Sequence, residues 1–105
     1  MKDKIMTKDM QKDLLFKAIP NIGLYTQAES AILKKMIEIS INNIAVIQAK
    51  DLKKQIDLSH TAVYSSLKTL QLKGVITKLQ SQPHSYELNQ EKLEYALNLY
   101  KNVHN

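Results

Sequence analysis

The chain has 105 residues, no cysteine, and 15 basic against 10 acidic side chains, which gives a formal net charge of +5. This length suits one small domain with a modest core, and the lack of cysteine excludes disulfides and thiolate metal sites. No apolar run approaches the roughly 20 residues that cross a bilayer, and the charged N-terminal stretch is unlike a signal peptide. We therefore expect a cytoplasmic protein that does not enter a membrane.

The basic side chains are unusual in type and in distribution. All of them are lysine, and no acidic residue occurs between Asp57 and Glu87. Together with a pI of about 9.4, this pattern favours a polyanionic partner. Lysine cannot form the planar fork that arginine makes with guanine, so a DNA-binding protein of this composition would have to find its site in another way.

Two helices are predicted in the N-terminal part of the chain. Residues 7–19 carry apolar side chains at helical spacing and end at Pro20. After a connector, Thr26 and Glu29 form a T-x-x-E capping box in front of a helix over residues 27–42. The apolar stripe of this second helix is wide, which predicts that it packs on more than one side.

The middle of the chain predicts a short strand and two helices joined by a tight turn. Residues 44–47 are apolar and partly β-branched, as is typical of a strand. A helix over residues 49–56 follows, and Ser59 is a good N-cap for the next helix, 60–73. Gly74 then stands where the end of a helix favours a left-handed residue.

The C-terminal third predicts a β-hairpin and a last helix. Residues 75–80 and 85–88 are predicted to be antiparallel strands, and the loop between them is rich in turn-forming residues. Asn89 can cap a helix over residues 90–101. The predicted order is therefore helix, helix, short strand, helix, helix, hairpin and helix.

The segment from Asp51 to Ile76, DLKKQIDLSHTAVYSSLKTLQLKGVI, joins the helix pair, the capped turn, the glycine stop and the start of the hairpin. It resembles the winged helix-turn-helix superfamily, and the resemblance covers about residues 26–88. The resemblance implies a mainly α fold with a small β-hairpin wing, flanked by N- and C-terminal helices, in a single domain over residues 1–105. It also implies that the helix 60–73 is a recognition helix, which lies in the major groove of DNA.

Candidate DNA contacts follow if the apolar side of the helix 60–73 faces inward. The polar side chains at its start would then face the groove, and these are Ser59, His60, Thr61, Tyr64, Ser65 and Lys68. Short side chains such as those of Thr61 and Ser65 allow close approach, and a threonine methyl group can touch a thymine methyl group. The alternative is an ordinary solvated helix face.

Phosphate contacts are expected from the neighbouring elements, because lysine binds phosphate without reading sequence. The candidates are Lys50, Lys53 and Lys54 on the supporting helix, and Lys78, Gln82 and His84 in the wing. For each of them a plain solvated surface is the alternative.

Nothing in the sequence suggests catalysis. His60, His84 and His104 lack the spacing of metal ligands, and there is no nucleophile–base arrangement and no glycine-rich phosphate loop. We therefore expect no enzymatic activity and no cofactor.

The two flanking helices, 7–19 and 90–101, are amphipathic. The resemblance implies a homodimer, since small winged-helix repressors commonly dimerise through such helices, and the candidate seam is Leu93, Leu97 and Tyr100. Alternatively, both helices cover their own core.

The expected function is sequence-specific binding of double-stranded DNA by a transcriptional repressor. A replication or partition protein of a mobile element and a protein–protein interaction module remain alternatives.

Overall fold

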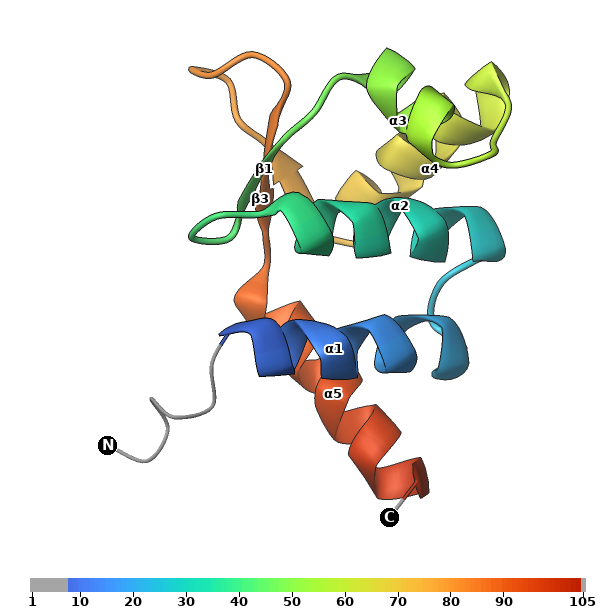
Figure 1. Cartoon of the computed structure of the whole chain (residues 1–105), viewed down its shortest axis with the longest axis vertical. Helices are drawn as coiled ribbons and strands as arrows, with labels where there is room; N and C mark the ends of the chain where they lie inside the picture. Colours follow the sequence, from blue (N-terminus) through green and yellow to red (C-terminus); the bar gives the residue numbers. More distant parts are fainter. Residues whose placement is uncertain (1–7, 105) are drawn as a thin grey trace.

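The structure, a computed structural model, describes residues 8–104, with side chains described over residues 12–103. Its elements are α1 (Lys8–Ala18), a 3-10 turn η2 (Ile19–Asn21), α2 (Gln27–Ile39), β1 (Ile44–Val46), α3 (Ala49–Gln55), α4 (His60–Leu72), β2 (Ile76–Lys78), β3 (Ser85–Leu88) and α5 (Gln90–His104). The fold is mostly helical with one small antiparallel sheet, in the predicted order (Figure 1). The predicted start of the first helix, residue 7, lies outside the described residues, as does the side chain of His104.

The helix α2 lies at the centre of the fold. It packs against α4 and β1 and also contacts α1, which runs alongside it in Figure 1. Its side chains Ile32, Leu33, Met36 and Ile37 are all buried in one hydrophobic core. The prediction that a wide apolar stripe packs on more than one side is therefore confirmed. No described helix is both long enough and apolar enough to cross a membrane.

The sheet has the strand order β1-β3-β2, and both pairings are antiparallel. The predicted hairpin is present, although its first strand is shorter than the predicted 75–80. The short strand predicted over residues 44–47 is also present, as β1. It pairs antiparallel with β3, and Ala45 lies opposite Tyr86. The sequence pattern predicts each strand but not this long-range pairing.

The capping box at the start of α2 is confirmed. The Thr26 N–H donates to Glu29 Oε1 at 2.9 Å, and the Glu29 N–H donates to Thr26 Oγ1 at 3.0 Å. These two bonds satisfy backbone donors that have no partner within the helix. Glu29 is nevertheless buried, so its carboxylate needs further hydrogen-bond partners within the fold.

The end of α2 differs from the predicted boundary at residue 42. The helix stops at Ile39, because Ser40 is extended, and Asn42 and Asn43 adopt left-handed conformations with φ of 53° and 66°. Asparagine tolerates this region better than most residues. Lys12 of α1 stabilises the stop, since its ammonium donates to the carbonyls of Glu38 and Ser40 at 3.1 and 3.2 Å.

Candidate nucleic-acid interface

The helices α3 and α4 are joined by a tight, hydrogen-bonded turn. Ile56 donates its N–H to the Leu52 carbonyl at 2.9 Å, and the Leu58 N–H donates to the Ile56 carbonyl at 2.7 Å. Ser59 then begins α4, and its Oγ accepts from the Ala62 N–H at 3.1 Å. The predicted N-cap is therefore confirmed, and the turn fixes how α4 leaves α3.

The end of α4 is a complete Schellman motif. Gly74 has φ of 77°, its N–H donates to the Gln71 carbonyl, and the Val75 N–H donates to the Leu70 carbonyl. Both Leu70 and Val75 are fully buried, as expected for the apolar pair that accompanies this motif. The glycine stop is confirmed, and it sends the chain directly into β2.

The start of α4 presents a polar face to solvent. Val63, Leu67 and Leu70 are buried on the inner side of the helix. The residues predicted to face outward are all exposed, and they are His60, Thr61, Tyr64, Ser65 and Lys68. Among the described residues, no acceptor is bonded to the N–H of His60 or Thr61, so two backbone donors also point to solvent at this end.

Tyr64 is the largest side chain on this face, with 52% of its surface exposed. Its ring centroid lies 4.5 Å from that of His60, one turn earlier, with an angle of 46° between the ring planes. Burial raises the pKa of Tyr86 on β3, and the phenol of Tyr64 raises it further. Tyr64 thus lies beside the exposed imidazole of His60.

The acidic side chains at the two borders of the acid-free segment lie outside α4. Glu87 alternates with the buried Tyr86 along β3, so it lies on the opposite face of the sheet. Asp57 lines a hollow with Ala28 and Ala31 of α2. The helix α4 itself carries no acidic side chain.

The other predicted contact residues are also on the surface. Exposed side chains include all of Lys50, Lys53, Lys54, Lys78, Gln82 and His84. His84 adopts a left-handed conformation with φ of 57°, and its carbonyl accepts from the Ile47 N–H at 2.9 Å. This bond connects the hairpin loop to the segment between β1 and α3.

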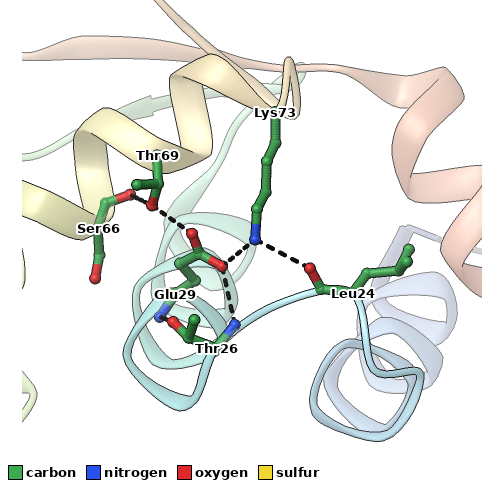
Figure 2. Close-up of polar contacts among 6 residues, drawn as sticks. All are labelled: Leu24, Thr26, Glu29, Ser66, Thr69 and Lys73. Carbon is green, nitrogen blue, oxygen red and sulfur yellow. Dashed lines mark hydrogen bonds and ion pairs between the residues drawn. The ribbon is translucent and has the colours of Figure 1, made fainter.

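A polar cluster around the buried carboxylate of Glu29 fixes the far end of α4, and the sequence pattern indicated only its capping-box part. Figure 2 shows the Glu29 carboxylate accepting hydrogen bonds from the Thr26 N–H, the Thr69 hydroxyl and the Lys73 ammonium. The Lys73 ammonium also donates to the Leu24 carbonyl at 3.0 Å and lies 5.3 Å from the centre of the Tyr25 ring. The cluster joins the start of α2 to the end of α4.

The surroundings of Glu29 keep its carboxylate charged. Burial alone would raise the pKa of Glu29, but hydrogen bonds from Lys73, Thr69 and Thr26 and the charge of Lys73 outweigh it and lower the pKa below 4.5. An ionised buried carboxylate with satisfied hydrogen bonds holds its partners more strongly than a neutral one. The ammonium of Lys73 is therefore bonded within the fold, to Glu29 and Leu24, whereas the predicted DNA-contacting lysines are exposed.

Leu93, which the sequence analysis assigned to a dimer seam, lies in the core of the chain instead. Leu93 is only 6% exposed and belongs to the chain's own core, so it is not available to a second copy. It is buried because α5 lies against α1, and Ala96 is buried beside it. Leu97 and Tyr100 are half-buried, and the strongly exposed apolar side chains of α5 are Tyr95 and Val103.

The described residues contain no group of histidine, cysteine, aspartate and glutamate side chains arranged to hold a metal ion. No protein-family model, no curated protein and no solved structure matches the chain.

Proposed function

We propose that this chain is a winged helix-turn-helix protein that binds double-stranded DNA at specific sequences, with α4 as the recognition helix. The observation that carries the proposal is the exposed, carboxylate-free start of α4. Five polar side chains there leave the helix on one side, opposite its buried seam. A major groove admits an α-helix and presents hydrogen-bonding groups and thymine methyl groups to such side chains.

Within this proposal the residues have distinct roles. His60, Thr61, Tyr64 and Ser65 contact base edges or phosphates near the start of α4, where the free N–H groups and the helix dipole also favour phosphate. Lys68, two turns into the helix, reaches the backbone or guanine. Ser59 contributes mainly by capping, since its hydroxyl oxygen already accepts from Ala62.

The lysines of α3 and the hairpin support binding without reading sequence. Lys50, Lys53 and Lys54 are exposed on the helix that packs beside α4, which suits phosphate contacts next to the groove. The hairpin β2–β3 is the wing, and Lys78, Gln82 and His84 offer a phosphate contact there. Without arginine the planar fork with guanine is not available, so specificity rests on lysine, on hydrogen bonds from smaller polar side chains, on methyl contacts and on DNA shape.

The role proposed for such a domain is that of a transcriptional repressor acting as a homodimer. A dimer doubles the contacts and fits a pseudo-palindromic site. The helix α5 supports the dimer, since Tyr95 and Val103 leave apolar surface in solvent, 56% and 73% exposed. Tyr100 would contribute from the half-buried side next to Val103, whereas Leu97 lies about 200° round the helix from Tyr95.

The test of the proposal is a pair of surface substitutions on α4. A bound sequence is first selected from a random pool of duplexes, and mobility shifts are then measured for Tyr64→Ala and Lys68→Glu. Both variants should lose specific binding while their thermal melts stay close to that of the native chain, because both side chains are exposed. Lys17→Glu, an equal charge change at an exposed position of α1, is the control. Unchanged binding by both α4 variants would remove α4 from the interface.

A further inference from the structure

Thr61 occupies the outward centre of α4. The buried side of this helix is formed by Val63, Ser66, Leu67 and Leu70. An α-helix turns by about 100° per residue, so the direction opposite the middle of the buried side passes within about 10° of Thr61. The exposed neighbours Tyr64 and Ser65 lie about 70° and about 30° from this direction. Thr61 therefore points away from the core more directly than either of them.

The side chain of Thr61 is also free to bind another molecule, unlike two other hydroxyl side chains of the same helix. Ser65 Oγ donates to the Ala62 carbonyl at 3.4 Å, and the Thr69 hydroxyl donates to the Glu29 carboxylate. Within the part of the chain that the structure describes, no hydrogen bond involves the hydroxyl of Thr61. Thr61 thus presents both a hydroxyl and a methyl group to solvent.

The composition of this part of the helix limits which base edges it can recognise. Residues 59–70 contain no arginine, asparagine, glutamine, aspartate or glutamate, so Lys68 is the one side chain there with a charged or forked contact to a particular base. A hydroxyl group can donate or accept, so on its own it does not separate one base from another. A methyl group does separate thymine from cytosine, because thymine alone of the four bases carries a methyl group in the major groove.

We propose that Thr61 contacts the C5 methyl group of a thymine, and that the DNA site of this chain requires a T·A base pair opposite Thr61. This contact rests on the proposed function, since it requires α4 in the major groove, and it names the base that α4 recognises. Thymine O4 lies on the same major-groove edge, so the free hydroxyl can donate to it. Leu72 is also exposed on this side of α4, but it lies about 16 Å further along the axis, whereas the start of a recognition helix contacts the bases.

The test removes single methyl groups from a duplex selected by the full chain. Each thymine is exchanged in turn for uracil, which lacks only the C5 methyl group, and affinity is measured by fluorescence anisotropy at one fixed salt concentration. At the thymine opposite Thr61 the exchange should weaken binding about fourfold, the effect of leaving one methyl group in water. At the same position, 5-methylcytosine should bind more tightly than cytosine by a similar factor, which identifies the methyl group as the feature recognised.

Substitutions in the protein assign the contact to Thr61. Thr61→Ser removes its methyl group and keeps the hydroxyl, so this variant should bind the thymine and uracil duplexes equally. Thr61→Val keeps a methyl group and should still distinguish them, as should the control Leu72→Ala.

Two results would overturn the thymine contact while the proposed function stands. One is a native chain that binds every uracil duplex as tightly as the thymine duplex, and the other is a fourfold difference that persists in Thr61→Ser. If no duplex is selected by the full chain, the proposed function and the thymine contact are both overturned.

Discussion

Glu29, in the first turn of α2, and Lys73, directly after the last residue of α4, form an ion pair with 2.5 Å between Oε1 and Nζ. The carboxylate side chain is 3% exposed and the lysine side chain 39%, so the pair is buried on one side and open to water on the other. The same carboxylate closes the capping box of α2. One side chain therefore begins a central helix and fixes the end of the proposed recognition helix.

The first prediction concerns the charge of this carboxylate. Glu29→Gln keeps a capping-box side chain but removes the ion pair, and should lower the free energy of unfolding by about 2 kcal/mol, the usual worth of a charge-assisted hydrogen bond. Urea denaturation measures the loss. In a Lys73→Met background, which keeps the aliphatic stem, the same substitution should cost at least about 0.5 kcal/mol less. An equal loss in both backgrounds would show that the pair does not act as a unit.

The second prediction is a dependence of stability on pH. The folded state lowers the pKa of Glu29, so it binds the proton more weakly than the unfolded chain does. The contribution of Glu29 is therefore complete above its ordinary pKa of 4.5 and disappears as the pH falls through the folded-state pKa. Unfolding free energies of the native chain and Glu29→Gln should differ most near neutral pH and converge in acid. A difference that grows in acid would contradict the lowered pKa.

The third prediction concerns Gly74. Its φ of 77° is strained for any residue with a Cβ, although an added Cβ would only reach ordinary contact with Lys92 at 3.6 Å. Gly74→Ala should therefore destabilise the fold by about 1 kcal/mol through its backbone alone. Gly74→Asn should cost less, because asparagine tolerates the left-handed region. Thermal melts of the two variants measure the order, and a more stable alanine variant would contradict it.

The fourth prediction tests the dimer. The full chain should scatter light as a dimer, and Tyr95→Glu with Val103→Glu should convert it to a monomer that is still folded, because both side chains are exposed. A truncation after Asn89 would not test the dimer alone, since it would also remove Leu93 and Ala96 from the core. A native chain that scatters as a monomer would end the dimer proposal.

Local chemistry in the sequence predicted most of the fold. The Thr26–Glu29 box, the Ser59 cap and the Gly74 stop are short-range signals, and the structure has helix ends at each of them. The end of α2 was predicted too late, because the apolar run continues to Ile41 while the backbone already leaves the helix at the extended Ser40.

Contacts between distant segments could not be predicted in the same way. The partners of Glu29 at the end of α4, Thr69 and Lys73, are 40 and 44 residues away, and nothing in the local pattern marks them. Helical periodicity placed Leu93 on the apolar side of α5, but it could not decide whether that side meets the chain's own core or a second copy. The outward face of α4 was predictable because it follows from the buried seam alone.

The salt dependence of DNA binding tests the central claim most directly. Anisotropy of a selected duplex, titrated with the native chain at salt concentrations from about 50 to 200 mM, should give an affinity that falls with a slope near 0.9 logarithmic units for each phosphate neutralised. Contacts by Lys68, the α3 lysines and Lys78 predict a steep slope, and Lys68→Glu should reduce both the affinity and the slope. Binding that is absent, or that does not change with salt, would contradict a DNA interface at the start of α4.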